Sequence, residues 1–259
     1  MNVFLQAFPI FLLIFCRITS FFVVAPLFSA KGVPNTFKIG LGFFISIIVY
    51  LAYGIGETVP MDSTYLLFVF REILAGVLLG FIVYLFFVVV QISGALIDLQ
   101  MGFGMANIVD PMTGASAPLT GNFKYWLLLV IFLSMNGHHY LLNALMHSYD
   151  WMPLSNELFA RIHDGSISEF VTKTVVMVFM LGFQLAAPIV VTMFLTDVGL
   201  GFLAKTAPQF NVFVIGMPLK ILVGFLIMLL TMPSMATLFS YLFSEMFDSL
   251  EQLFAIVKG

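Results

Sequence analysis

The sequence predicts an all-α, polytopic membrane protein, and three observations lead to this prediction. Of its 259 residues 61% are hydrophobic, only 9% are charged, and the mean hydropathy is +1.11. Such a chain has too few polar groups to cover a water-soluble surface. Its apolar runs are far longer than the roughly 10 residues of a barrel strand, and apolar and polar residues do not alternate within them. The backbone N–H and C=O groups must therefore be hydrogen-bonded within helices when they lie in lipid.

Six apolar segments reach the roughly 20 residues that a helix needs to span a bilayer. They cover about residues 3–30, 37–55, 64–97, 124–146, 169–196 and 211–232. A seventh segment, 233–257, has apolar residues every three or four positions and polar ones opposite, which is typical of an amphipathic helix. Prolines inside or beside the segments predict kinks or breaks, at Pro9, Pro26, Pro188, Pro218 and Pro233. We therefore expect about six long, kinked apolar segments followed by a C-terminal amphipathic helix.

The charged residues exclude some partners and suggest an orientation. The net charge is only -3 and no run of Lys and Arg resembles a nucleic-acid surface, so we expect no nucleic-acid partner. Turns with lysine alternate with acidic turns along the chain, and the lysines are Lys31, Lys38, Lys124 and Lys205. Under the positive-inside rule, this alternation predicts an N-terminus outside the cytoplasm.

No pattern of catalytic or metal-binding residues accompanies the hydrophobicity. The sequence has no G-x-S-x-G, H-E-x-x-H or Walker motif, and its single cysteine, Cys16, excludes a thiolate cluster. His138 and His139 are adjacent and would point about 100° apart on a helix, unlike the i, i+4 pair that binds zinc. We expect no enzyme, no cofactor and no metal. An intramembrane hydrolase would lack a nucleophile with its base.

Four charged residues inside apolar segments call for an explanation. Arg17 lies in the middle of the first segment, where insertion costs roughly 2.5 to 3.5 kcal/mol, so it should face protein or water. Arg71 and Glu72 begin the third segment, and Lys220 lies in the sixth. We predict that Arg17 and Lys220 make buried polar or inter-subunit contacts. The alternative, stronger for Arg71, Glu72 and Lys220, is that they extend from helix ends toward water.

A glycine-rich segment, Ser93–Phe123, differs from the rest of the chain. It carries five glycines and two prolines, and Gly102 and Gly104 permit conformations that end a helix. Its apolar residues would not suit an aqueous loop, and they include Met101, Phe103, Met105, Ile108 and Val109. A flexible apolar loop with methionines suits a deformable seal in a channel, because Met adapts its shape and apolar constrictions exclude water. The alternative is a re-entrant packing loop without a gating role.

The same segment carries a family resemblance. DLQMGFGMANIVDPMTGASAP resembles the signature loop of the FliR family of flagellar biosynthetic and type III secretion export-gate proteins. LAAPIVVTMFLTDVGLGFLAKTAPQFNVFVIGMPLK, Leu185–Lys220, resembles the C-terminal signature of that family. There are three supporting matches: the residues around Arg17, the stretch APLFSAKGVPNTFKIGLG and the stretch NGHHYLL. The similarity therefore covers nearly the whole chain.

The resemblance implies a non-enzymatic subunit of the flagellar type III protein export gate. It implies one domain, 1–259, with a FliP-like part at about 1–165, which includes a re-entrant loop at 98–122, and a FliQ-like part at about 166–259. It also implies FliP-like and FliQ-like partner subunits, FlhB-like and FlhA-like neighbours, unfolded export substrates and membrane lipid. The location implied is the bacterial cytoplasmic (inner) membrane, multi-pass, at the flagellar basal body.

In the resembling family the loop that matches Met105–Val109 projects into the channel as part of a plug. We expect the plug loop to consist of Met101, Gly102, Phe103, Gly104, Met105, Ala106, Asn107, Ile108, Val109, Asp110 and Pro111. Gly102 and Gly104 would be its pliable points, and Asp110 and Pro111 would anchor its far end. The rival function is a small-solute secondary transporter or channel, which would need an inverted repeat and a buried carboxylate with a cationic partner.

Overall fold

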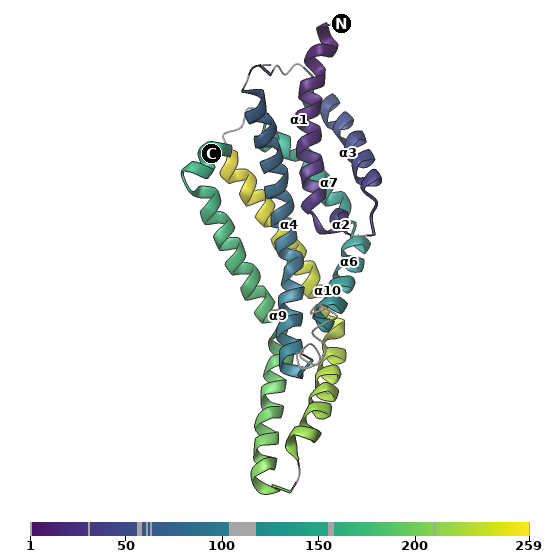
Figure 1. Ribbon diagram of the computed structural model, residues 1–259, viewed down its shortest axis with the longest axis vertical. Helices are drawn as coiled ribbons and strands as arrows, with labels where there is room; N and C mark the ends of the chain where they lie inside the picture. Colours follow the sequence, from purple (N-terminus) through teal and green to yellow (C-terminus); the bar gives the residue numbers. More distant parts are fainter. Residues whose placement is uncertain are drawn as a thin grey trace, which may run out of the picture. The chain divides into compact units, whose positions relative to one another are not determined.

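The fold is described by a computed structural model, and within the described residues every regular element is a helix. The described residues are 2–30, 32–55, 59–60, 62, 64–103, 118–154, 158–209 and 211–258, with side chains from residue 7 onward. The helices in chain order are α1 (Asn2–Val24), α2 (Pro26–Ser29), α3 (Asn35–Val49), the π-helix η1 (Tyr50–Gly54), α4 (Tyr65–Met101), α6 (Leu119–Ser134), α7 (Gly137–Trp151), α8 (Leu158–His163), α9 (Ser166–Thr206) and α10 (Val212–Lys258) (Figure 1).

Five of these helices are long and apolar enough to cross a membrane, and the bent pair α6 and α7 would make a sixth span. The chain is thus the polytopic, all-α membrane protein that its composition predicts. By contacts it divides into two compact units, each built from separate stretches of sequence. Unit 1 comprises Met1–Phe86, Leu133–Val175 and Phe243–Gly259, and unit 2 comprises Phe87–Phe132 and Val176–Leu242.

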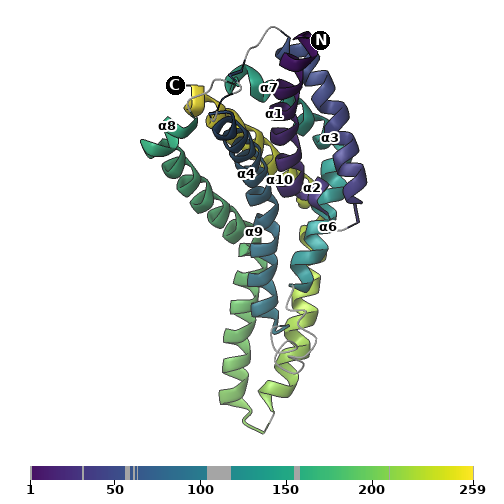
Figure 2. The same ribbon diagram turned by 45° about the horizontal axis from the view of Figure 1, so that its top comes forward.

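Unit 1 is organised around α1. The helices α1 and α3 run side by side in both views (Figures 1 and 2). Helix α1 ends at Val24 because Ala25, directly before Pro26, takes an extended conformation (ψ 125°) that the proline ring favours. The break expected at Pro26 is therefore confirmed, and the first apolar segment is two helices instead of one.

Close contact between α1 and α4 in unit 1 depends on two glycines spaced four residues apart. A Cβ atom on Gly76 would lie 2.2 Å from the carbonyl oxygen of Arg17, and one on Gly80 would lie 3.1 Å from that of Phe21. Neither distance leaves room for a side chain without movement of the backbone. The small residues let the two helix backbones approach closely, as in other membrane helix pairs.

Unit 2 contains a hairpin of α9 and α10, whose turn lies at the bottom of Figure 1. Lys220 of α10 forms an ion pair with Asp197 of α9, with 2.5 Å between Nζ and Oδ1. Five apolar side chains from α4 and α9 form the core of the unit: Ile97, Met101, Ala186, Ile189 and Met193.

The structure corrects two predicted helix boundaries. α10 is one helix from Val212 to Lys258, so the predicted amphipathic helix is not separate from the sixth segment. The chain continues through Pro233, although proline has no N–H to donate to the carbonyl oxygen of Leu229. The nearby hydroxyls of Thr231 and Ser234 donate to other main-chain carbonyls, those of Met228 and Thr231. The amphipathic pattern itself is confirmed, since the apolar positions of its unit 1 part are buried: Phe243, Met246, Leu250, Leu253 and Val257.

The second correction concerns the predicted segment 124–146, which is interrupted. α6 ends at Ser134 and α7 begins at Gly137, and between them Asn136 has φ 58°. Asparagine tolerates this left-handed conformation better than other residues with a side chain, so it can end one helix and begin the next. The sequence N-G at 136–137 carried this signal, although the surrounding hydrophobicity concealed it.

A further helix start is fixed by local hydrogen bonds. The Asp164 carboxylate accepts hydrogen bonds from the main-chain N–H and the hydroxyl of Ser166 at the start of α9, across Gly165 with φ 85°. These bonds stabilise the ionised form and so lower the pKa of the exposed Asp164 carboxyl. They satisfy one of the unpaired N–H groups of the first helical turn.

Replacement of Gly76 tests the close contact between α1 and α4. We expect Gly76→Ala to destabilise the protein by about 1–3 kcal/mol, because the added methyl group meets main-chain atoms of α1. Gly40→Ala is the matched control, since a Cβ there meets nothing within 4 Å and alanine favours the helix by about 1 kcal/mol. Thermal unfolding of the detergent-purified variants measures both effects. Equal melting temperatures for the two variants would contradict the contact.

Candidate functional site

Two buried polar clusters lie in the otherwise apolar helices. The first, in unit 1, connects α1, α4 and α7 through Arg17 and is called the Arg17 cluster. The second, in unit 2, joins α4 to α6 at the two ends of the glycine-rich segment and is called the loop base. Each is described in turn.

The Arg17 cluster centres on an ion pair between two fully buried side chains. Arg17 Nε donates to Glu72 Oε2 at 2.7 Å, and Nη2 donates to Oε1 at 3.1 Å. Both side chains have 0% of their surface exposed. The pairing is bidentate, which is the strongest and most directional arrangement of guanidinium and carboxylate.

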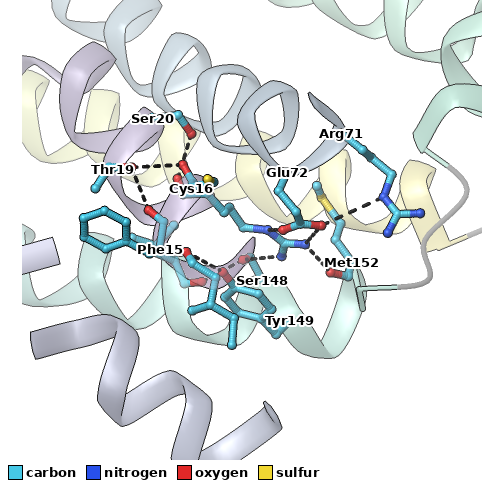
Figure 3. A network of polar contacts seen from close by, with 12 residues as sticks. Phe15, Cys16, Thr19, Ser20, Arg71, Glu72, Ser148, Tyr149 and Met152 are labelled. Atoms are coloured by element: carbon cyan, nitrogen blue, oxygen red, sulfur yellow. Dashed lines mark hydrogen bonds and ion pairs between the residues drawn. The ribbon is translucent and has the colours of Figure 1, made fainter. Parts of the chain in front are cut away.

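Helix α7 and Met152, the residue directly after it, supply the remaining partners of the guanidinium. Arg17 Nη1 donates to Ser148 Oγ at 3.1 Å, and Nη2 donates to the carbonyl oxygen of Met152 at 2.8 Å. Tyr149 lies with its ring 4.0 Å from Arg17 Cζ, a cation–π contact. In Figure 3, Glu72, Ser148, Tyr149 and Met152 gather around one point, and their partner there is Arg17.

The structure shows where three of the charged residues singled out in the sequence lie. Arg17 was predicted to meet protein or water, and in this chain it meets protein, with its ion-pair partner inside the same chain. The alternative prediction, that Glu72 extends from a helix end toward water, is wrong, because Glu72 is fully buried. Arg71 is also buried, with Nε 3.9 Å from Glu72 Oε1 and its guanidinium 4.8 Å from the Phe68 ring.

Lys220 lies in a different setting. Its side chain is 21% exposed and that of its partner Asp197 is 43% exposed, so within this chain the pair is partly exposed. The pair lies on the α9–α10 hairpin, and an inter-subunit contact of Lys220 stays a prediction. Asp197 was not among the residues predicted from the sequence.

The loop base fixes the points where the glycine-rich segment leaves and re-enters the helices. Gly102 has φ 87°, and the Phe103 N–H donates to the carbonyl oxygen of Asp98 at 3.0 Å. This is the hydrogen bond of a Schellman motif, which ends α4 at Met101. The predicted loop 98–122 is therefore too long at both ends, because α4 continues to Met101 and α6 already begins at Leu119.

Two residues of the predicted plug loop pack against α10 in unit 2. Met101 is fully buried, and its Sδ and Cε atoms fill the space beside Gly224, where a Cβ would lie 2.8 Å and 2.6 Å from them. The rings of Phe103 and Phe225 meet edge to face at 6.2 Å. Gly104, Met105, Ala106, Asn107, Ile108, Val109, Asp110 and Pro111 lie outside the described residues.

Polar bonds connect α4 to the start of α6. Asp98 Oδ1 lies 2.7 Å from the hydroxyl of Thr120, and both carboxylate oxygens lie 3.3 Å from its main-chain nitrogen. Four residues further along α6, the Nζ of Lys124 donates to Ser93 Oγ at 3.1 Å. Lys124 is 1% exposed, so it is a buried residue of the loop base and not only a charge that marks orientation.

These contacts were missed because nothing in the sequence pairs residues 22 or 31 positions apart. The available signal was a charge within an apolar helix, Asp98 in LIDLQM, which costs free energy unless it is paired. Gly94 and Gly121 gave a second signal, as small residues on the two helices. A Cβ on Gly94 would lie 2.1 Å from the Cα of Gly121.

The charged groups of the Arg17 cluster are bonded to one another and to the carbonyl oxygen of Met152. Among the described residues no three His, Cys, Asp or Glu side chains lie where they could hold a metal ion. The arrangement holds the helices in fixed positions, which is a structural role.

Comparison with known proteins gives matches along nearly the whole chain. The family described as "Bacterial export proteins, family 1" matches residues 8–246. A flagellar biosynthetic protein FliR of Bacillus subtilis (strain 168) is 39% identical over 257 residues, which cover 99% of each chain. A flagellar biosynthetic protein FliR of Escherichia coli (strain K12) is 32% identical over 238 residues, 92% of this chain and 89% of the relative. Yop proteins translocation protein T of Yersinia pestis is 28% identical over 216 residues, 83% of this chain and 82% of the relative.

A charge-removal series tests the Arg17 cluster. We expect Glu72→Gln to destabilise the protein by about 3–5 kcal/mol, because it leaves the buried Arg17 guanidinium without a counter-charge. The double variant Arg17→Met with Glu72→Leu should lose less, since it removes both charges. Glu169→Gln is the matched control: its pair with Lys173 is exposed and should cost less than about 1 kcal/mol. Thermal unfolding in detergent measures the three. A double variant less stable than Glu72→Gln would contradict the account.

Proposed function

The chain belongs to the bacterial export proteins, family 1, and we propose that it is a non-enzymatic subunit of the flagellar type III protein export gate. In this proposal it completes, with FliP-like and FliQ-like subunits, a channel for unfolded flagellar proteins. FlhA-like and FlhB-like components are its further neighbours. The gate lies in the bacterial cytoplasmic membrane at the flagellar basal body.

The names of the relatives support the flagellar system over a virulence system. The relatives from Bacillus subtilis and Escherichia coli are named flagellar biosynthetic proteins, and they match with higher identity and coverage than the Yersinia translocation protein. Two of the names concern flagellar biosynthesis and the third concerns translocation of Yop proteins. A role in protein export is supported by the family, which is described as bacterial export proteins.

The observation that carries the proposal is the loop base. An apolar, glycine-rich loop leaves α4 at Gly102 and re-enters α6 at Leu119, with both ends fixed on membrane helices. A loop held in this way can obstruct a passage without leaving it. In our proposal Met105, Ile108 and Val109 form the apolar seal.

The described residues at the near end of the plug loop have separate roles in the proposal. Met101 is fully buried beside Gly224 and Phe103 contacts Phe225, so we assign these two residues to fixing the near end. Gly102 supplies the turn, as its φ of 87° requires. Gly104 remains a proposed pliable point, and Asp110 and Pro111 remain proposed anchors of the far end.

Partner subunits are supported by the apolar surface of unit 2. Large apolar side chains on α9 and α10 are more than half exposed in the isolated chain, among them Phe183, Phe194, Phe202, Phe213, Leu226 and Leu230. Lipid covers some such surface, and we propose that FliQ-like helices cover part of it. The division into a FliP-like part, 1–165, and a FliQ-like part, 166–259, belongs to the same proposal.

Of the two features that a secondary transporter would need, the buried carboxylate with a cationic partner is present. Glu72 and Arg17 are a buried carboxylate and its cationic partner. They are bonded to each other and to Ser148 and Met152, so neither is available to a solute. The export gate therefore remains the better supported function.

Purification of the complex and deletion of the seal test the proposal together. Extracted from membranes of the source bacterium, the tagged chain should bring FliP-like and FliQ-like chains with it. Deletion of residues 105–109 should leave this assembly intact and make the membrane permeable to small ions, because the apolar constriction is lost. The measurements are mass spectrometry of the complex and ion efflux from cells.

A chain that purifies alone or as a homo-oligomer would contradict the gate. A correctly assembled deletion variant with unchanged permeability would contradict the seal. Deletion of five other residues of the same glycine-rich segment, 112–116, controls for shortening the loop as such.

A further inference from the structure

We propose that Asp98 is a positioning residue that latches the start of α6, where the glycine-rich segment that carries the plug loop re-enters the helices, to α4. This inference rests on the proposed function, because it assigns a task to Asp98 within the seal. It concerns residues that lie on helices, outside the loop itself.

The carboxylate meets the start of α6 at the position where that helix needs a partner. The first N–H groups of a helix have no acceptor within the helix, and in an apolar surrounding an unpaired N–H costs free energy. Asp98 lies 3.3 Å from the Thr120 main-chain nitrogen through each of its oxygens. Thr120 is the second residue of α6, so Asp98 serves as a cap supplied by another helix.

The Thr120 hydroxyl strengthens the same link. Its oxygen lies 2.7 Å from Asp98 Oδ1 and 2.9 Å from the carbonyl oxygen of Gly94, so its one proton has two acceptors, both on α4. Asp98 is 7% exposed and Thr120 1% exposed. A hydrogen bond to a charged group is stronger when water cannot compete for it.

The surrounding contacts favour one fixed separation of the two helices. Gly94 and Gly121 lie so close that a side chain on Gly94 would meet the Cα of Gly121 at 2.1 Å. Lys124 is buried on α6, and its charge and that of Asp98 attract each other. Release of the latch would leave both Asp98 and the α6 N–H group unpaired in apolar surroundings.

The latch and the Met101 contact act on opposite ends of the loop. Met101 fixes the near end beside Gly224 of α10, whereas Asp98 fixes the far end against α4. Both ends must hold for the intervening residues to keep a defined position. Loss of the latch alone should therefore loosen the seal although every residue of the seal is present.

The test compares ion leak in variants of the full chain expressed with its partner subunits. Asp98→Leu, which is similar in size but accepts no hydrogen bond, should lower the ratio of closed to open gates by roughly tenfold or more, the factor that about 1.4 kcal/mol gives. Asp98→Asn should leak less than Asp98→Leu, because its amide oxygen can still accept from Thr120. Glu169→Leu is the control: its ion pair with Lys173 is exposed and lies in unit 1, and leak should not change.

Thr120 supplies a second test that does not alter the charge. Thr120→Val removes the hydroxyl at nearly constant shape and should leak, whereas Thr120→Ser keeps the donor and should remain tight. If Asp98→Leu fails to assemble, this pair decides the question. Leak in the Val variant together with a tight Ser variant is an effect that a purely packing role would not produce, because packing alone would favour Val, which keeps the shape of Thr120.

The outcomes separate this inference from the proposed function. If deletion of 105–109 leaks while Asp98→Leu and Thr120→Val assemble and stay tight, the latch is contradicted and the seal stands. If the deletion does not leak either, the proposed seal itself fails. Equal leak in the Val and Ser variants of Thr120 would likewise contradict the latch.

Discussion

The buried ion pair of Arg17 and Glu72 is the interaction on which unit 1 depends. A guanidinium in the middle of an apolar helix is tolerated only if every charge and donor finds a partner, and α1 alone offers none. Glu72 of α4 supplies the counter-charge, and Ser148 and Met152 supply the remaining acceptors. Three elements distant in sequence are thereby held in one arrangement. Hydrophobic packing alone, being non-directional, would not specify that arrangement.

The same requirement organises unit 2. Asp98 and Lys124 are buried charges whose partners lie across the α4–α6 contact, and glycines on both helices allow the backbones to approach. α4 ends at the turn of Gly102, and the proposed plug loop begins there. The composition of that loop suits a deformable seal.

Hydrophobicity and local signals predicted the helical membrane class, the break at Pro26 and the helix stop at Gly102, because each depends on residues close together in sequence. Arg17 was correctly expected to be shielded, since burial of an unpaired charge is costly wherever it occurs. The pairing of Arg17 with Glu72 could not be predicted, and neither could the pairing of Asp98 with Thr120, because both pairs depend on how the helices pack. Continuity of α10 through Pro233 was missed for a related reason: the surroundings of a helix in a membrane protein, which local sequence does not determine, can tolerate a proline that would end a helix in water.

The central claim is that the Arg17 cluster lies within one chain and prepares a subunit that carries the plug loop. A cryo-electron microscopy structure of the closed complex, purified from membranes with its partner subunits, tests this most directly. The account predicts density for the Arg17 guanidinium joined to Glu72 and the Met152 carbonyl of its own chain, with residues 105–109 facing the channel axis. Density that joins Arg17 to a carboxylate of a neighbouring subunit, or a loop directed away from the axis, would contradict it.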